Sequence, residues 1–383
     1  MCGNVTCLFS NDRKYKNHPN LKAILFYGSK FNQSDLPLPR NGILWALLHE
    51  ESPRNTPILS HEPVLSLFNY SSTFSRYSDV PLTLQYLTSI EDLTSKKYFK
   101  TVEQKNKLLS DLSPVIYIQS DCVTPINRDS YVAELMKYIN VDSYGGCLHN
   151  KNLPVSLQDS MKTMMSPELF QFVSQYKFAI AFENGICDDY ITEKLWRPLI
   201  AGTVPIYIGS PSVKDWLPNN MSVIFAFDFD SPMHLATYLH QLNTDPEQYK
   251  RHLRHKINGS VDNKLLLDEM ASRGWSTDNS YEAVTLIDAF MCSVCKRTYS
   301  RVESTVGQKQ YDCPRPVSSL TRRDNQSNWW HNDWDISACE AKTVRGLVNR
   351  NVNFTESELR DLTFSNIVNN KCQIGLKDHN TPT

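Results

Sequence analysis

The pattern of apolar and polar residues divides the chain into an opening part with few predicted elements and a longer part in which elements alternate. Two short apolar runs, at 21–27 and 42–49, lie among proline-rich loops and predict buried strands. From Ser113 onward, apolar runs alternate with amphipathic runs. The runs that predict strands are VIYIQS, VDSYG, FAIAF, VPIYIG and VIFAFDF, and those that predict helices are YVAELMKYI, PELFQFVSQ, TEKLWRPLI and the stretch from His234. Such alternation is typical of a parallel sheet wrapped by helices.

This alternation predicts an α/β fold with two domains and a tail. We expect a first domain at 1–112, a doubly wound domain at 113–296, and a loosely structured tail at 297–383, which is polar and rich in proline, asparagine and serine. The length of 383 residues suits two hydrophobic cores. Doubly wound domains bind ligands beyond the carboxyl ends of their strands, so we expect ligand-binding residues in the loops that follow these strands.

The charge balance excludes a strong general attraction to nucleic acid or to a membrane surface. Forty basic residues face 41 acidic ones, which leaves a net charge of −1. An anionic ligand must therefore be held by local groups. No segment approaches the roughly 20 apolar residues of a membrane span, and the opening MCGNVTC lacks the charged and apolar regions of a signal peptide.

Cysteines and glycosylation motifs favour an oxidising compartment. The ten cysteines include two close pairs, Cys2 with Cys7 and Cys292 with Cys295. Seven sequons begin at Asn4, Asn32, Asn69, Asn220, Asn258, Asn325 and Asn353. A zinc site at the C-x-x-C is the alternative, but no second close pair of Cys or His supplies tetrahedral ligand spacing. We therefore expect a lumenal protein of the endoplasmic reticulum or Golgi, held as a type II membrane protein by an N-terminal anchor that this chain does not include.

The stretch FENGICDDYITEKL, at 182–195, predicts an anion site between a strand and a helix. Thr192 is a candidate N-cap, which leaves free N–H groups and the positive end of the helix dipole facing the loop. Lys194 adds a full positive charge in the first turn, where a phosphate would be stabilised. Glu193 could accept hydrogen bonds from ribose hydroxyls. The alternative is a solvated lysine with loop-stabilising neighbours, and no G-x-G-x-x-G or Walker motif accompanies the stretch.

This stretch, followed by AGTVPIYIGSP, resembles the signature of the α1,3-fucosyltransferase family, whose members use GDP-fucose. SDCVTPINRDSYVAELMKYINVDSYGGC resembles the start of the family's donor domain, and LLHEESPRN with LFNYSSTFSRYSDV resembles its acceptor-side domain, so the resemblance covers roughly 40–295. It implies two Rossmann-like domains in the B-type glycosyltransferase architecture, transfer with inversion and no metal or other cofactor. It also implies a first strand before Cys2, which we expect this chain to lack.

The resemblance assigns roles to six residues. Cations must meet the phosphates as the GDP leaving group gains negative charge, and the matching positions are Lys194 and Arg128. Glu193, Asn184 and Tyr190 match donor-contacting positions, with Glu193 assigned to the ribose. Glu51 matches the family's proposed general base for the acceptor hydroxyl. The sequence departs from the family pattern with a second acid at Glu50, with Asp121 in place of an asparagine, and with Pro198 inside the predicted helix.

The acceptor remains open between three readings. The finer match is to the divergent animal branch of the family that is linked to protein O-fucosylation, which implies Ser or Thr of EMI-type disulfide-rich domains in secreted proteins. The VDSYGGC stretch resembles core fucosyltransferases of plants and insects, which implies GlcNAc of N-glycans. A catalytically silent folding or binding factor is the third reading. Retention of the residues listed above favours an enzyme.

Two other polar groups invite catalytic readings that we consider weaker. The D-x-D at Asp228 and Asp230 occurs in metal-dependent sugar transferases, but a solvated strand end is the simpler interpretation. His49 stands beside Glu50, yet adjacent strand residues point to opposite faces, so we expect a structural histidine.

Three disulfides follow from the predicted layout. Cys122 follows one predicted strand and Cys147 follows its neighbour, so both lie near one sheet edge and are expected to pair. Cys2 and Cys7 are expected to pair with Cys292 and Cys295, which would tie the last helix of the predicted second domain to the first domain. The pairing of the remaining cysteines is left open.

Overall fold

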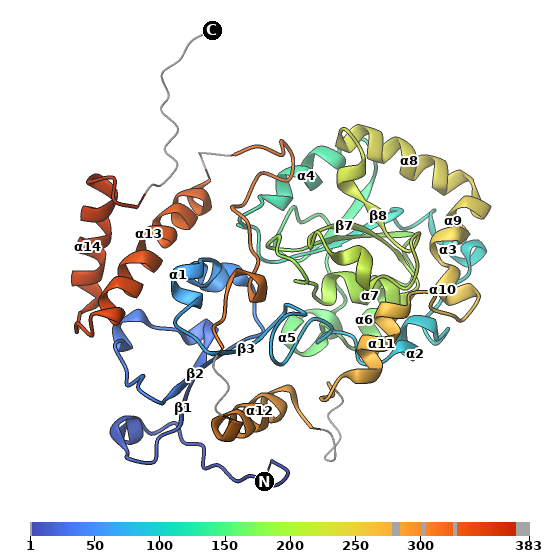
Figure 1. Ribbon diagram of the computed structural model, residues 1–383. Coiled ribbons are helices and arrows are strands. Elements are labelled where there is room, and N and C mark those ends of the chain that lie inside the picture. The colour runs from blue at the N-terminus through green and yellow to red at the C-terminus, as the bar shows by residue number, and fades with distance from the viewer. Residues whose placement is uncertain (1, 278–283, 301–303, 325–327, 373–383) are drawn as a thin grey trace. The chain divides into compact units, whose positions relative to one another are not determined.

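The computed structural model describes residues 2–277, 284–300, 304–324 and 328–372. They belong to two compact units, which Figure 1 shows with their elements labelled. The first unit is built from Met1–Thr83, Thr285–Pro316 and Gln326–Thr383, and the second from Leu84–Val284 and Val317–Asn325. Both contain a parallel sheet with helices, which confirms the α/β fold class.

The first unit contains a three-stranded parallel sheet in the order β1-β2-β3. Strands β1 (Ala23–Tyr27) and β2 (Leu44–His49) are those predicted from the apolar runs. Strand β3 (Tyr70–Thr73) has a polar sequence and was not predicted. Its Ser72 hydroxyl donates to the carbonyl of Val80 at 2.8 Å, and its Thr73 hydroxyl donates to that of Gln310 at 2.6 Å. These hydrogen bonds allow polar side chains to be fully buried.

Much of the predicted loose tail is helical. The first unit contains α1 (Glu62–Leu65), α12 (Leu286–Ser300), α13 (Trp329–Asn349) and α14 (Glu356–Val368). The prediction was wrong for α13 and α14 because polar residues surround their few apolar positions. In α13 the buried Val344, Leu347 and Val348 recur at helical spacing and face the unit's interior.

The second unit is a doubly wound domain with a five-stranded parallel sheet in the order β5-β4-β6-β7-β8. Its strands are β4 (Val115–Ile118), β5 (Val141–Tyr144), β6 (Phe178–Phe182), β7 (Val204–Ile208) and β8 (Ile224–Phe225). Its helices are α2 (Ile90–Thr94), α3 (Val102–Leu108), α4 (Arg128–Leu135), α5 (Ser160–Thr163), α6 (Pro167–Val173), α7 (Glu193–Ala201), α8 (Pro232–Thr244), α9 (Pro246–His252), α10 (Arg254–Ile257) and α11 (Lys264–Ser272). All five strands match predicted ones, although β8 is shorter because a 3-10 turn at Ala226–Asp228 ends it.

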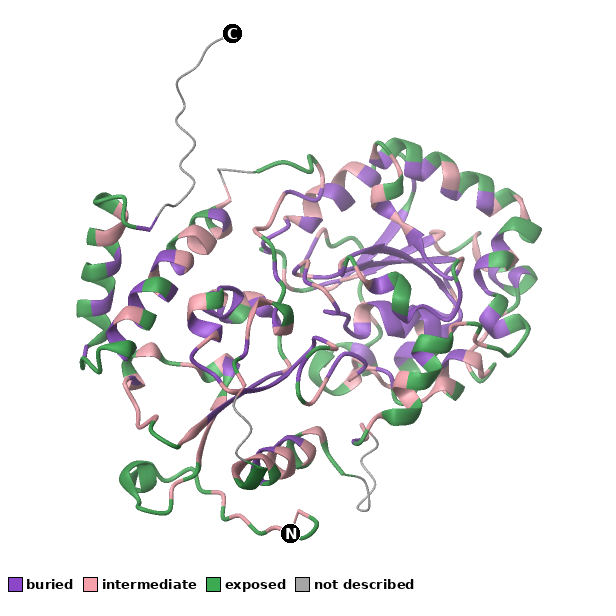
Figure 2. Ribbon diagram, viewed as in Figure 1, coloured by how far each residue is buried: buried purple, intermediate pink, exposed green. Residues whose placement is uncertain are grey.

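Helices cover both faces of this sheet, so its strands are buried on both sides (Figure 2). Along β6, Phe178, Ile180 and Phe182 contribute to the core that includes α4 and α8. Ala179 and Ala181 contribute to the core that includes α6 and α7. The small alanines leave room for the bulky side chains of α7.

The boundaries between the units differ from the predicted ones. The second unit begins at Leu84 rather than after residue 112, because α2 and α3 pack within it. Lys105 of α3 illustrates this, since its buried ammonium group donates to the carbonyls of Ser174 and Tyr176. Helix α12, predicted to end the 113–296 domain, belongs to the first unit.

The three predicted disulfides are confirmed. Cys122 pairs with Cys147, Cys2 with Cys292 and Cys7 with Cys295, and the last two bonds hold the N-terminal segment to α12. A further disulfide, Cys339–Cys372, joins α13 to the segment after α14. Among the described residues, none of the helices combines the length and the apolar character needed to cross a bilayer.

Candidate active site

The loop between β6 and α7 carries most of the predicted donor residues. Thr192 caps α7 as predicted, because its hydroxyl accepts a hydrogen bond from the N–H of Lys194 at 3.3 Å. Helix α7 ends at Gly202, which adopts a left-handed conformation with φ of 73°. Pro198 lies within the helix, as the sequence predicted. The loop therefore leads into a well-capped helix whose amino end faces the residues described below.

Glu193 and Lys194 form an ion pair at the start of α7. The Lys194 ammonium lies 2.9 Å from Glu193 Oε1, and Arg197 lies 3.9 Å from the same oxygen. Burial alone would raise the pKa of Glu193, but the charges of Lys194 and Arg197 outweigh it and lower that pKa to about 2. The carboxylate is thus ionised throughout the physiological range. It can accept hydrogen bonds from hydroxyl groups of a ligand.

Glu183 is a fully buried acid that the sequence analysis did not assign. Its carboxylate accepts from the N–H of Thr192 at 2.8 Å and from the Thr192 hydroxyl at 2.7 Å. Lys194 lies 3.9 Å away. Burial raises the pKa of Glu183 to about 6, despite the opposing effect of Lys194. The available sequence signal was an acid directly after a buried strand, at the carboxyl end where ligands bind.

Gly209 shows how closely Glu183 is packed against the neighbouring strand. A Cβ at this position would lie 2.2 Å from the Tyr207 hydroxyl and 2.7 Å from Glu183 Cγ. A glycine is needed directly after β7 because there is no space for a larger residue. The glycine of the GSP segment is therefore required to leave space for Tyr207 and Glu183.

Asn184 and Tyr190 lie together, as expected for two residues of one site. The Tyr190 hydroxyl donates to Asn184 Oδ1 at 2.9 Å. Tyr190 is buried, so its ring helps to hold the loop while its hydroxyl keeps the asparagine amide in place. Both residues sit between β6 and α7, next to Glu183 and Glu193.

Arg128 lies at the same sheet edge but is engaged with the protein. It is the first residue of α4, and its guanidinium donates to the Phe182 carbonyl at 2.9 Å, and at 2.8 Å each to Gln119 Oε1 and the Asp121 carbonyl. Only 1% of its surface is exposed. The structure thus places Arg128 beside the donor loop as a brace between the ends of β4 and β6. Its role as a phosphate ligand stays a prediction.

The predicted base, Glu51, belongs to the first unit. It follows β2 and is exposed, whereas its neighbour Glu50 is partly buried and accepts a hydrogen bond from the Tyr27 hydroxyl at 2.8 Å. Burial and the bond to Glu50 raise the pKa of Tyr27 to about 12. The two adjacent acids thus have different environments. Glu50 is anchored, and Glu51 is accessible from solvent.

His49 is structural, as expected. It is fully buried, its Nδ1 lies 2.8 Å from the Tyr311 hydroxyl, and the two rings stack. Burial lowers the pKa of His49 to about 4, so the ring is neutral at physiological pH. A Cβ on Gly28 would lie within 2.4 Å of this ring, which shows how tightly the histidine is packed.

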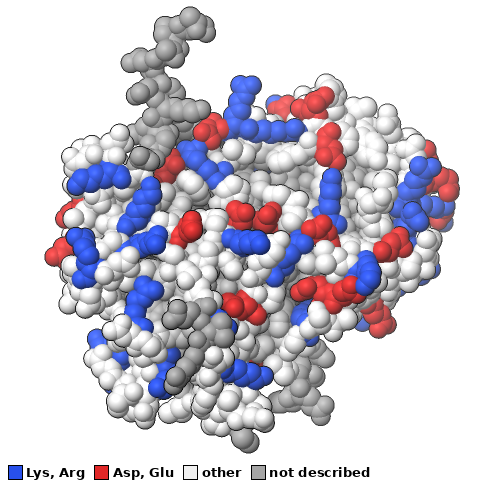
Figure 3. All heavy atoms as spheres, viewed as in Figure 1, with Lys and Arg blue, Asp and Glu red and all other residues white. Residues whose placement is uncertain are grey.

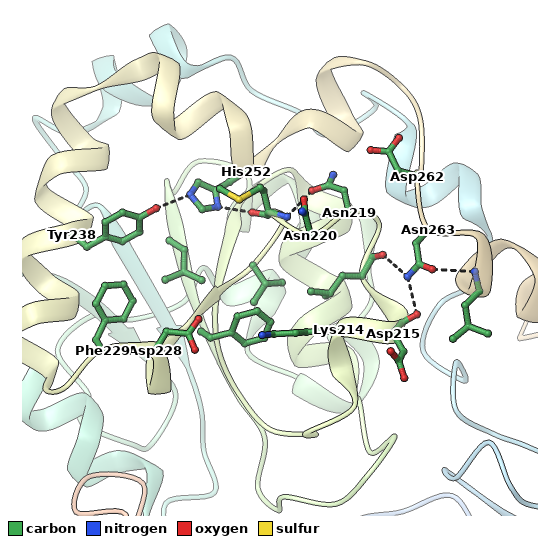
Figure 4. Close-up of a pocket in the computed structure, with 16 residues that line it drawn as sticks. Lys214, Asp215, Asn219, Asn220, Asp228, Phe229, Tyr238, His252, Asp262 and Asn263 are labelled. Atoms are coloured by element: carbon green, nitrogen blue, oxygen red, sulfur yellow. Dashed lines mark hydrogen bonds between the residues drawn. The ribbon is translucent and has the colours of Figure 1, made fainter.

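The cavity drawn in Figure 4 is a poor candidate for an anionic donor. It has a volume of about 750 Å³ and lies beside β8, α8 and α9 of the second unit. Three carboxylates line it, Asp215, Asp228 and Asp262, against a single lysine, Lys214. Burial lowers the pKa of the lining His252, which disfavours its charged form. The predicted donor residues are not among those that line this cavity.

The other candidate acid groups have simple environments. Asp228 and Asp230 of the D-x-D are both exposed, in agreement with a solvated strand end. The Sγ atoms of Cys122 and Cys147 and a carboxylate oxygen of Asp129 lie within 4.8 Å of one another, which is a spacing that could suit a metal ion. The two cysteines are joined in a disulfide, so their sulfur atoms are not available as thiolate ligands.

Comparisons with known proteins identify relatives over most of the chain. The family model described as glycosyltransferase family 10 (fucosyltransferase), C-terminal part, matches residues 102–311. The chain is 44% identical to GDP-fucose protein O-fucosyltransferase 3 of Xenopus tropicalis over 379 residues, which cover 95% of this chain and 80% of that protein. The human protein of the same name is 44% identical over 380 residues, which cover 95% of this chain and 79% of that protein. A crystal structure of alpha1,3-fucosyltransferase with GDP has a TM-score of 0.41 and 18% identity, covering 74% of this chain and 80% of that chain.

Proposed function

Because the chain belongs to glycosyltransferase family 10, the fucosyltransferases, we propose that it transfers L-fucose from GDP-fucose to a Ser or Thr hydroxyl of a protein. The observation that carries this proposal is the 44% identity, over 95% of the chain, to relatives named GDP-fucose protein O-fucosyltransferase 3. The acceptors that we propose are EMI-type disulfide-rich domains of secreted proteins. Transfer to GlcNAc of N-glycans in place of Ser or Thr would exclude the protein acceptor.

The donor is proposed to bind at the loop between β6 and α7. The amino end of α7 and Lys194 supply positive charge for the diphosphate, and Glu193 can accept from the ribose hydroxyls. Lys194 would then exchange its bond to Glu193 for one to a phosphate oxygen. Asn184 and Tyr190, which are hydrogen-bonded to each other on the same loop, are proposed to complete the donor contacts.

The proposed reaction is a single displacement with inversion. Glu51 takes the proton of the acceptor hydroxyl while that oxygen bonds to C1 of fucose. The bond between C1 and the β-phosphate oxygen breaks, and GDP departs with the electron pair. The negative charge that develops on GDP is stabilised by Lys194. Because cationic side chains and a helix terminus meet this charge, we propose that the reaction needs no metal ion.

The experiment that tests the function combines the purified chain with GDP-fucose and a folded EMI-type domain. Mass spectrometry should detect the gain of one deoxyhexose on Ser or Thr, and the reaction should continue in the presence of EDTA. Lys194→Ala should lower both donor affinity and rate, because a diphosphate contact operates in the ground state and strengthens in the transition state. Transfer that occurs only onto GlcNAc-terminated glycans would exclude the protein acceptor. Activity that vanishes with EDTA and returns with Mn²⁺ would exclude the metal-free mechanism.

We also propose that the protein works in the lumen of the secretory pathway. The support comes from its disulfides, four of which are described above, and from its seven sequons. Protein acceptors that carry disulfides fold in the same compartment. An epitope-tagged full-length protein should therefore colocalise with endoplasmic reticulum or Golgi markers, and a cytosolic distribution would contradict the proposal.

A further inference from the structure

The first two residues of α13 form an exposed aromatic pair in the first unit. The rings of Trp329 and Trp330 stack with their centroids 3.9 Å apart and an interplanar angle of 25°. Trp329 is 53% exposed, although tryptophan is among the side chains that gain most from burial. Two turns further along the helix, Ile336 is 47% exposed. The seven-residue spacing places Ile336 on the same side of α13 as Trp329, in a stripe where the polar Asn332 and Asp333 lie between the two apolar side chains.

This stripe belongs to an element that packs on the segment carrying the proposed base. Arg54, three residues after Glu51, places its guanidinium carbon 5.6 Å from the centroid of the Trp330 ring. One turn along α13, Trp334 contacts His61 with ring centroids 4.5 Å apart. Helix α13 also packs against α1 and the 3-10 turn at Pro57–Ser60, and Figure 1 shows α13 beside α1. Trp329 and the exposed Glu51 are therefore carried by one packed body.

The helix that presents the stripe is held rigidly. The Cys339–Cys372 disulfide joins α13 to the chain after α14. Asn366 Nδ2 of α14 donates to the Thr343 hydroxyl of α13 at 3.0 Å, and Lys342 donates to the Cys372 carbonyl at 2.6 Å. A rigid surface loses little conformational entropy when a partner binds. The stripe is therefore rigid, which is expected of a binding surface.

We propose that Trp329, backed by Trp330 and Arg54 and extended by Ile336, is a binding surface for the polypeptide of the protein acceptor. This inference rests on the proposed function and adds to it the residues that select the acceptor. A Ser or Thr hydroxyl is common to all proteins, so selectivity needs contacts away from the reacting oxygen. Tryptophan and arginine are the residues that most often dominate the energy of protein interfaces.

A polypeptide fits this surface better than a glycan does. The second contact offered here is an exposed aliphatic side chain, Ile336, two turns from Trp329. The similarity to relatives named as protein O-fucosyltransferases extends over 95% of the chain, whereas the family model ends at residue 311, before α13 begins. Both observations favour a protein partner for α13.

The test uses steady-state kinetics with GDP-fucose and a folded EMI-type domain. Trp329→Ala should lower kcat/KM for this acceptor about 30-fold, mainly by raising KM, as expected when an interface loses a dominant aromatic anchor. Trp329→Phe should restore most of the loss, because a flat ring remains. The matched control is Phe364→Ala, which removes another exposed aromatic residue, 68% exposed, from α14 of the same helical pair. This control should behave as the wild type, and thermal unfolding checks that every variant is folded.

Each alternative outcome overturns the inference in a recognisable way. An unchanged KM for Trp329→Ala, with an active wild type, would overturn the inference and leave the proposed function standing. Equal losses in Trp329→Ala and Phe364→Ala would assign the effect to the helical pair as a whole. A loss seen only with GlcNAc-terminated glycan acceptors would replace the polypeptide by a sugar. A wild type that fucosylates no protein would overturn the proposed function, and this inference with it.

Discussion

At the scale of single residues, Glu183 controls the geometry of the loop proposed to bind the donor. Its carboxylate holds both the N–H and the hydroxyl of Thr192, the residue that caps α7. It also contributes a negative charge 3.9 Å from Lys194. Because the side chain is fully buried, ionising it is unfavourable unless these partners remain in place. Glu183 is therefore a positioning residue whose charge depends on pH.

We predict that Glu183 makes donor binding depend on pH around 6. Burial raises the pKa of Glu183 to about 6, so the group is neutral below that pH and negative above it. Loss of the negative charge next to Lys194 should tighten binding of the anionic GDP-fucose by about threefold to tenfold between pH 7.5 and 5.5. Isothermal titration at several pH values measures this change. Glu183→Gln keeps a hydrogen-bond acceptor for Thr192 and should abolish the pH dependence.

The raised pKa of Glu183 also predicts how the free energy of unfolding changes with pH. A carboxyl whose pKa is raised on folding stabilises the folded state below its unfolded pKa, and this contribution is lost as the pH rises through about 6. A rise of the pKa from 4.5 to about 6 corresponds to about 2 kcal/mol. Relative to the wild type, Glu183→Gln should therefore gain stability as the pH rises from 4.5 to 7. A difference in unfolding free energy that stays constant over this range would contradict the assignment.

The two adjacent acids after β2 are predicted to differ in function. Glu51→Gln keeps shape and hydrogen bonding but cannot take a proton, so transfer should fall about 10²–10⁴-fold while donor binding is retained. Glu50→Gln is the matched control, and because Glu50 is bonded to Tyr27, we expect a much milder effect. Acceptor-dependent release of GDP measures both rates. Full activity of Glu51→Gln together with an inactive Glu50→Gln would exchange the two roles.

At the scale of elements, the sequence predicted those whose apolar pattern is continuous. Strands β4, β6 and β7 are buried on both faces and are written as apolar runs, so they could be identified directly. Strand β3 was missed because its buried hydroxyls donate hydrogen bonds to carbonyl groups that only the folded chain brings near. Within the donor loop, the cap at Thr192 was predictable from residue type. The role of Glu183 was not, because it depends on burial.

The position of α3 shows why a domain boundary is difficult to predict. A lysine in this helix suggests a segment exposed to solvent. The ammonium group of Lys105 is nevertheless buried, and it donates to the carbonyls of Ser174 at 2.7 Å and Tyr176 at 2.6 Å and to the Thr203 hydroxyl at 3.2 Å. Burial lowers the pKa of Lys105 well below its usual value. The lysine thus acts as a donor for carbonyls at the end of α6. No pattern within α3 alone reveals partners about 70 residues away.

We predict that α3 depends on this lysine for its attachment to the second unit. Lys105→Met removes the donor and leaves two buried carbonyls without it, which should lower the free energy of unfolding by about 2–4 kcal/mol. Lys107→Met, on the exposed side of the same helix, is the matched control and should change stability by less than about 0.5 kcal/mol. Denaturant unfolding of the two variants gives both values. Equal stability of the two would show that the buried ammonium group is dispensable.

At the scale of the whole molecule, the chain has no dominant charge. Figure 3 shows basic and acidic side chains interspersed over the face in view, which agrees with the net charge of −1. Local groups such as Lys194 must therefore provide the attraction for an anionic donor. The first unit holds its N-terminal segment by two disulfides to α12, across sequence separations of 290 and 288 residues. Reduction of these bonds would release long loops, so the folded chain suits an oxidising compartment.

Lumenal folding would also leave a selective pattern of glycans on the chain. Asn4, Asn258 and Asn353 are exposed, so a glycan on each can extend into solvent. Asn69 is different, because its Oδ1 accepts from the backbone N–H of Trp45 at 3.1 Å and its Nδ2 donates to the Ser304 carbonyl at 3.2 Å. A glycan would replace one hydrogen of Nδ2 and crowd the contact of this nitrogen with the segment that follows α12. We therefore expect the folded protein to carry glycans at exposed sequons and none at Asn69.

Site-resolved mass spectrometry after deglycosylation in heavy-oxygen water tests this pattern on protein purified from the secretory pathway. Asn258→Gln should remove one glycan and leave stability unchanged, because the side chain is exposed at the end of α10. Asn69→Gln should remove no glycan and should still destabilise the first unit by about 1–3 kcal/mol, because two partly buried backbone groups lose their partners. Glycan occupancy at Asn69 would contradict the described packing of β2 and β3. Absence of glycans at every exposed sequon would argue against passage through the lumen, since the exposed asparagines have no structural reason to escape modification.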